Sequence, residues 1–182
     1  MALLDSPLCD FGWPAPDFTL ADPDGQSFTF SQQIGPNGIV LAFLCNHCPY
    51  VKAITYRLAQ DSAILQDNGI AVLGIMSNDY QTYPDDAPDQ MTRFAKAAGW
   101  NFPYLVDEDQ SVGQAYGAVC TPDFFGFNGT GGLQYRGRLD SAAMGDATDR
   151  TPELVNAMLQ IAETGAGPRQ QTPSMGCSIK WR

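Results

Sequence analysis

The stretch Ile39-Val-Leu-Ala-Phe-Leu-Cys45-Asn-His-Cys48-Pro49 decides the fold of this chain. Its first part, Ile39 to Phe43, is a continuous apolar run, which predicts a β-strand buried on both faces. From Val51 to Leu65, apolar side chains recur at intervals of three and four, which is helical spacing. The sequence therefore places two cysteines, separated by two residues, where a buried strand turns into a helix.

That position favours a reactive sulfur. The first turn of a helix favours negative charge, because its backbone N–H groups are unpaired and the helix dipole is positive there. We therefore expect the pKa of Cys45 to lie below the ~8.5 of a free cysteine. Cys48, one helical turn later, is the expected disulfide partner, and a protonated His47 would further stabilise the Cys45 thiolate. Pro49 is compatible with a helix start, since its missing N–H would have no partner there.

Other interpretations of the two cysteines are a zinc site and simple packing. A Cys-x-x-Cys pair is often half of a zinc site or a redox pair. Zinc would need two further ligands at similar spacing, and the single histidine of the chain, His47, lies inside the motif itself. We therefore favour a redox pair, and we expect neither a metal nor an organic cofactor.

Composition limits the classes of protein. The length of 182 residues with 44% hydrophobic content suits one domain over residues 1–182 with a full core. The formal charge of −10 argues against nucleic acid or an anionic membrane as a partner. The beginning of the chain lacks the basic region of a secretory signal, and five cysteines form no framework spacing, so a cytoplasmic location is expected.

The rest of the chain predicts alternating strands and helices. Residues 70–76 form a second apolar run, which should pair in parallel with the first strand. Thr151 is the expected N-cap of the last helix. The tail, residues 165–182, is polar except near its end, where apolar residues accompany Cys177. Further elements are expected as a hairpin of 18–20 and 27–30, a short helical turn near 31–35, helices near 88–98, 110–116 and 152–163, a strand at 102–106, and a hairpin of 124–127 and 133–139.

This order of elements resembles the thioredoxin fold. The run Ala15-Pro-Asp-Phe-Thr-Leu20 and the extra strand and helix resemble peroxiredoxins, over roughly residues 9–163. The motifs are similar to those of peroxiredoxin-like thioredoxin-family proteins of the alkyl hydroperoxide reductase/thiol-specific antioxidant type: Cys45 to Pro49, Cys120 to Phe125, and Ser174 to Trp181. The resemblance implies a three-layer α/β/α sandwich with a peroxiredoxin-type N-terminal hairpin and a βα insertion.

The resemblance also implies a role for Thr121 and Pro122. Proteins of the thioredoxin fold place a cis-proline before the strand that follows the central helices, opposite the two cysteines. Pro122 matches that position, and a cis bond before proline costs only ~0.5–1 kcal/mol. The Thr121 backbone is then expected to pair with an extended substrate chain.

Thiol–disulfide exchange is the function that this pattern favours. Cys45 would attack a substrate disulfide, Cys48 would resolve the mixed disulfide, and an external dithiol would reduce the pair again. The substrate would be a protein or small-molecule disulfide. Cys120 and Cys177 are possible auxiliary thiols, and Cys177 could form a disulfide with Cys48 or Cys120.

Two other functions stay open. A thiol peroxidase is the first, although the peroxide-binding Pro-x-x-x-Thr-x-x-Cys pattern of peroxiredoxins, laid on Cys48, places Leu41 and Cys45 where proline and threonine should stand. The second is a copper(I) carrier with Cys45 and Cys48 as soft thiolate ligands.

Overall fold

A central sheet of seven strands carries the fold. A computed structural model describes residues 2–182 of the chain. The strands lie in the order β3-β2-β6-β5-β4-β8-β9. Strand β4, in the interior of the sheet, pairs in parallel with β5 and antiparallel with β8. The strands are β2 (Thr19–Ala21), β3 (Ser27–Thr29), β4 (Ile39–Phe43), β5 (Ala71–Met76), β6 (Tyr104–Val106), β8 (Asp123–Phe127) and β9 (Leu133–Gly137).

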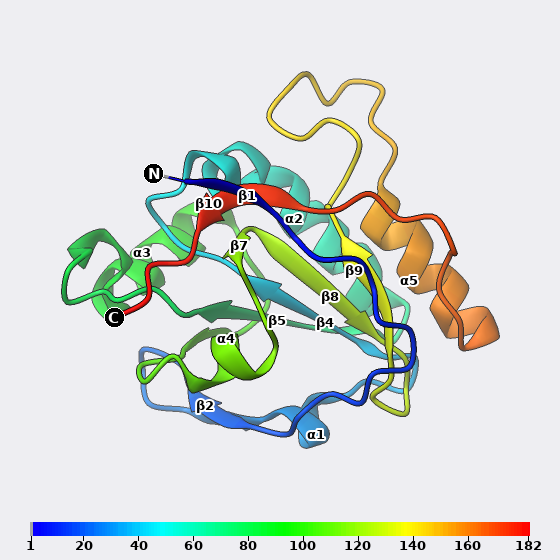
Figure 1. The fold of residues 1–182 in the computed structure, drawn as a ribbon, viewed down its shortest axis with the longest axis horizontal. Coiled ribbons are helices and arrows are strands. Elements are labelled where there is room, and N and C mark those ends of the chain that lie inside the picture. The colour runs from blue at the N-terminus through cyan, green and yellow to red at the C-terminus, as the bar shows by residue number, and fades with distance from the viewer. Residues whose placement is uncertain (1) are drawn as a thin grey trace.

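Helices cover both faces of this sheet, so the predicted three-layer α/β/α arrangement is confirmed (Figure 1). Strand β4 shows why both faces must be covered. Its side chains alternate, with Val40 in the core under α2, α3 and α5 and Leu41 in the core under α1 and α4. All five residues of β4 are buried. The helices are α1 (Phe30–Gln33), α2 (Pro49–Asp67), α3 (Pro88–Ala98), α4 (Ser111–Ala115) and α5 (Glu153–Thr164), with a 3-10 turn at Pro84–Asp86.

A second, three-stranded sheet joins the two ends of the chain. Its strands are β1 (Leu3–Asp5), β10 (Met175–Ser178) and β7 (Cys120–Thr121), in the order β1-β10-β7. Both pairings are antiparallel. In Figure 1 the blue N-terminal strand and the red C-terminal strand run side by side. The sequence predicted none of this sheet, because its strands are very short and lie far apart along the chain.

The sequence placed most other elements correctly. The hairpin of β2 and β3, the parallel β4–β5 pair, α3 with Gly99 as its left-handed C-cap, and the hairpin of β8 and β9 are confirmed. One predicted detail is wrong: Pro152, rather than Thr151, occupies the N-cap of α5, because the helix begins one residue later at Glu153. Within residues 2–182, no helix has the length and apolar character needed to cross a membrane.

Candidate active site

The two cysteines of the motif lie between β4 and α2, as the sequence predicted. Helix α2 begins at Pro49, and Cys48 is its N-cap. Cys45 lies in the loop between β4 and α2. The exposed fractions of Cys45 and Cys48 are only 1% and 0%. The pair is therefore positioned at the helix start but is covered by other parts of the protein.

Thr121 and Pro122 lie against this pair. The peptide bond between them is cis, as predicted. The Thr121 hydroxyl lies 3.2 Å from the Cys45 sulfur. The thiol of Cys48, when protonated, donates to the carbonyl oxygen of Thr121 at 3.2 Å. The structure thus brings together residues that are more than 70 positions apart in the sequence.

Cys177 joins the same cluster. It lies on β10, directly opposite Thr121 in the antiparallel register. Its sulfur is 2.9 Å from the sulfur of Cys48, and its exposed fraction is 4%. Of the two possible auxiliary thiols, Cys177 is therefore the one that contacts the motif.

Cys120 has a different environment. It is fully buried, and its thiol donates to the carbonyl oxygen of Pro122 at 3.6 Å. Burial raises the pKa of Cys120 well above its usual range. This thiol is held as a neutral, packed side chain.

The hydrogen bonds of the cluster favour the thiolate form of Cys48 over that of Cys45. Hydrogen bonding from the Cys45 thiol lowers the pKa of Cys48 to about 4, against the opposing effect of burial, and the Cys177 thiol and the backbone N–H of Val51 act in the same direction. The same hydrogen bond, together with burial and the nearby Asp86 carboxylate, raises the pKa of Cys45. The prediction that the pKa of Cys45 lies below the ~8.5 of a free cysteine is therefore wrong. Because α2 begins at Pro49, the helix start acts on its N-cap, Cys48.

His47 forms a partly buried ion pair that the sequence did not indicate. Its Nδ1 atom lies 2.7 Å from a carboxylate oxygen of Asp86, which is fully buried. The backbone N–H of Asn46 donates to the other oxygen at 2.7 Å, and the Asn78 side chain donates to the first at 2.8 Å. The hydrogen bond to Asp86 raises the pKa of His47. The loop that carries Asp86 is rich in acidic residues, and nothing in the sequence separates Asp86 from Asp85.

Replacing Asp86 with asparagine is expected to return the pKa of His47 toward its ordinary ~6.5. The variant removes the carboxylate that stabilises the imidazolium form. The chain has a single histidine, so one imidazole signal in an NMR pH titration reports the change. Asp85→Asn is the matched control, because the Asp85 side chain makes no ion pair with His47. An unchanged His47 titration in Asp86→Asn would contradict the ion pair.

A metal could in principle use Cys45, His47 and Asp86, whose ligand atoms all lie within 4.8 Å of one another. The hydrogen bonds of Asp86 weigh against this use. One of its oxygens accepts from the backbone N–H groups of Asn46 and His47, and the other from the side chains of His47 and Asn78. A metal ion would have to displace these donors, so the donor set fits a hydrogen-bonded ion pair better than a metal site.

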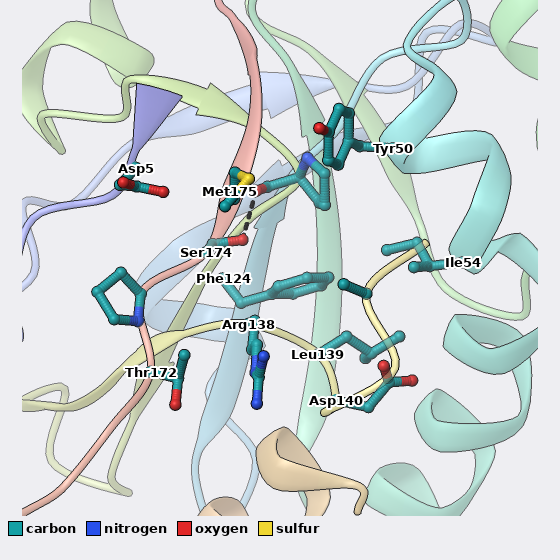
Figure 2. A pocket seen from close by; sticks show the side chains of 13 residues that line it. Asp5, Tyr50, Ile54, Phe124, Arg138, Leu139, Asp140, Thr172, Ser174 and Met175 are labelled. Carbon is teal, nitrogen blue, oxygen red and sulfur yellow. Dashed lines mark hydrogen bonds between the residues drawn. The ribbon is translucent and has the colours of Figure 1, made fainter. Parts of the chain in front are cut away.

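An apolar cavity of about 240 Å³ opens beside Pro122. Figure 2 shows Tyr50 and Ile54 of α2, Phe124 of β8 and the segment Thr172–Met175 around it. Within this wall, the hydroxyl of Ser174 donates to the carbonyl oxygen of Pro122 at 2.6 Å. The cavity adjoins the start of α2, the cis-proline and the strand that carries Cys177.

Three comparisons place this chain among known proteins. The family model described as "AhpC/TSA family" matches residues 11–138. A Mycobacterium tuberculosis protein named "Putative peroxiredoxin" is 30% identical over 122 residues, which cover 63% of this chain and 68% of that protein.

Two solved structures are similar over all or nearly all of the chain, and a third shares the fold over part of it. An uncharacterized conserved protein from Geobacillus kaustophilus has a TM-score of 0.93 at 37% identity, covering 100% of this chain and 97% of that one. A hypothetical protein from Sinorhizobium meliloti has a TM-score of 0.90 at 37% identity, covering 98% of both chains. A secreted disulfide oxidoreductase of Mycobacterium tuberculosis shares the fold, with a TM-score of 0.55 at 22% identity over 64% of this chain and 80% of that one.

The family match spans more than half of the chain and includes β4, the two cysteines and the cis-proline. It agrees with the thioredoxin-like arrangement of the sheet and helices. This chain belongs to the AhpC/TSA family.

Proposed function

We propose that the protein is a thiol–disulfide oxidoreductase whose working pair is Cys45 and Cys48. The observation that carries the proposal is the position of the Cys48 sulfur. It lies at the N-cap of α2 and beside the cis-proline, with hydrogen bonding from Cys45 and Cys177 that favours its thiolate form. A thiolate is the nucleophile in disulfide exchange.

The roles of the two cysteines follow from their surroundings. The Cys48 thiolate attacks one sulfur of a substrate disulfide, whose S–S bond breaks, and the second substrate sulfur leaves as a thiolate. Cys45 then attacks the Cys48 sulfur, releases the first substrate sulfur, and gives its proton to the departing thiolate. The substrate gains two electrons and the pair becomes a disulfide, which an external dithiol reduces again.

Neighbouring residues hold this pair. The Thr121 hydroxyl contacts the Cys45 sulfur. The His47–Asp86 ion pair fixes the loop between the cysteines through the backbone N–H groups of Asn46 and His47. We assign positioning roles to Thr121, Pro122 and His47, and we propose an external dithiol as the electron donor.

Trapping of a mixed disulfide tests the function and the roles together. Both variants carry Cys177→Ser, so that this thiol cannot resolve the intermediate. With oxidised glutathione, the Cys45→Ser/Cys177→Ser variant is expected to accumulate one glutathione on Cys48, because no resolving thiol remains. The Cys48→Ser/Cys177→Ser variant is expected to react far more slowly. Mass spectrometry of the intact chain and of its peptides reads the result.

The two ways in which this experiment can fail are distinct. Accumulation on Cys45 in the Cys48→Ser/Cys177→Ser variant, with none on Cys48 in its counterpart, would reverse the roles and leave the function intact. No mixed disulfide in either variant, in protein that melts like the wild type, would refute exchange chemistry at this pair.

A thiol peroxidase is the second candidate, because the relatives named "Putative peroxiredoxin" are 30% identical to this chain over 122 residues. In that case, the Cys48 thiolate would attack hydrogen peroxide to form a sulfenic acid, with hydroxide leaving, and the Cys45 thiol would then close the disulfide with loss of water. Rapid mixing with hydrogen peroxide separates the candidates. Oxidation of Cys48 no faster than that of free cysteine rejects the peroxidase.

A further inference from the structure

Strand β10 occupies the edge of β7 beside the working pair. Its Cys177 faces Thr121 in the antiparallel register, and Ser178 faces Cys120. An exposed strand edge presents unpaired backbone groups and is where an extended chain adds to a sheet. The tail of this protein itself fills the edge next to the cis-proline.

Hydrogen bonds hold the tail in place on both sides of Cys177. Before it, the backbone N–H of Ser174 donates to the Ser6 hydroxyl at 2.9 Å, and its own hydroxyl donates to Pro122. After it, the backbone N–H of Lys180 donates to the Asn78 side chain at 2.9 Å. These contacts place Cys177 in one position along the edge.

Gly176 allows the tail to come this close. A Cβ atom at this position would lie 2.0 Å from the carbonyl oxygen of Thr121 and 2.6 Å from its carbonyl carbon. Only glycine fits such an approach between two backbones. The neighbouring Cys177 sulfur consequently stands 2.9 Å from the Cys48 sulfur, about 0.9 Å longer than an S–S bond.

We propose that Cys177 is a third redox-active cysteine, which takes the disulfide over from the Cys45–Cys48 pair as a Cys48–Cys177 bond and so fastens β10 covalently over the site. This inference rests on the proposed exchange function. The tail also separates Cys48 from external disulfides, because Cys48 has no exposed surface while β10 is in place. An external disulfide then enters only when β10 leaves the β7 edge.

The transfer is a balanced exchange within one chain. The Cys177 sulfur attacks the Cys48 sulfur of the Cys45–Cys48 disulfide, forms the new S–S bond and breaks the old one. Cys45 leaves as a thiolate and takes up the proton that Cys177 loses. No electrons are gained or lost overall, so no further oxidant is needed.

The charges in the cluster agree with this order of events. In the reduced protein, burial and the Cys48 thiolate raise the pKa of Cys177 to about 12. When Cys48 is oxidised to a disulfide, it loses its negative charge and no longer accepts a hydrogen bond from the Cys177 thiol as a thiolate does. The pKa of Cys177 then falls, so Cys177 becomes a better nucleophile at the time when the disulfide is present. Cys120, on the adjacent strand, donates to Pro122 instead.

Peptide mapping tests the transfer directly. Lys52 is the first trypsin site, and Arg169 and Lys180 bracket the tail. A Cys48–Cys177 disulfide therefore joins peptide 1–52 to peptide 170–180. After oxidation of the folded protein with one equivalent of oxidised glutathione and alkylation of free thiols, we expect this joined pair in the wild type and in Cys45→Ser.

Two further variants locate the bond. Cys9 also lies in peptide 1–52, so Cys9→Ser is the matched control and is expected to keep the joined pair. Cys48→Ser and Cys177→Ser are expected to lose it, with melting temperatures confirming that they are folded.

The alternative results are decisive. Cys177 found fully alkylated in the wild type and in Cys45→Ser, while the wild type closes Cys45–Cys48, overturns the inference and leaves the proposed function standing. A joined pair that survives in Cys48→Ser overturns the assignment to Cys48. A wild type that closes neither disulfide overturns both the inference and the proposed function.

Discussion

A valine in place of Gly176 is expected to raise the rate at which iodoacetamide alkylates Cys45 and Cys48 by about ten- to hundredfold. Overpacking against a fixed backbone costs about 1–3 kcal/mol, and 1.4 kcal/mol corresponds to a factor of ten. The new side chain would start 2.0 Å from the Thr121 carbonyl oxygen. Cys45 and Cys48 are 1% and 0% exposed, so on the inference that β10 covers the pair, their alkylation proceeds through states in which β10 has left its edge.

The measurement has an internal reference and a matched control. Cys9 lies in the same tryptic peptide and is partly exposed, so its alkylation should not change. Gly132→Ala adds a side chain at a glycine where the nearest atom would be 3.5 Å away, and it should leave all rates as in the wild type. Equal rates for Cys48 in Gly176→Val and the wild type would show that β10 does not control access to the pair.

Local patterns in the sequence predicted the frame of the site. The apolar run of β4 followed by helical spacing in α2 fixes a strand-to-helix turn, and Cys45 and Cys48 lie inside it. Such patterns act over a few residues, so they can be recognised without the rest of the chain. Pro122 was also predicted correctly, because a resemblance to the family placed it.

Strand β10, which covers the active site, is held by contacts between distant parts of the chain, and no local sequence pattern predicts such contacts. Strand β10 pairs with β1 at the other end of the chain and with a β7 of only two residues. Backbone hydrogen bonds hold these strands, and any sequence can make such bonds. The contact between Asp86 and His47 could not be predicted for the same reason, because the two residues are 39 positions apart and come together only through the fold of a loop.

The error over Cys45 and Cys48 has a simple physical origin. The sequence indicates that a helix begins near the motif. The stabilisation of a thiolate by the start of a helix, however, differs between neighbouring residues. Proline at the first helical position makes Cys48 the N-cap, and the tail, which the sequence could not place, adds the Cys177 thiol as a further donor. The buried Asp86 carboxylate opposes the charge on Cys45.

The lowered pKa of Cys48 and the raised pKa values of the other four cysteines predict a single thiolate in the reduced protein at neutral pH. An ordinary cysteine is only a few per cent ionised at pH 7, whereas the hydrogen bonds from Cys45 and Cys177 lower the pKa of Cys48 and favour its ionised form. Burial raises the pKa of Cys9 to about 11 and that of Cys120 further, and both Cys45 and Cys177 have raised values. The ultraviolet absorbance of thiolates should therefore correspond to one sulfur per chain.

The pH dependence of that absorbance, and of stability, follows from the direction of the shift. The thiolate signal should persist from neutral pH downward and disappear as the pH falls through about 4. Because the folded pKa of Cys48 is lower than the unfolded value of ~8.5, its stabilising effect is complete above ~8.5 and is lost as the pH falls toward 4. Relative to Cys48→Ser, the wild type should lose unfolding free energy progressively as the pH falls across that window. Cys9→Ser should keep the neutral-pH signal, and Cys48→Ser should lack it, since the charge depends on the one sulfur at the start of α2. A wild-type signal that appears only above ~8.5, as for cysteine in an unfolded peptide, would contradict the thiolate state of Cys48 on which the proposed exchange chemistry depends.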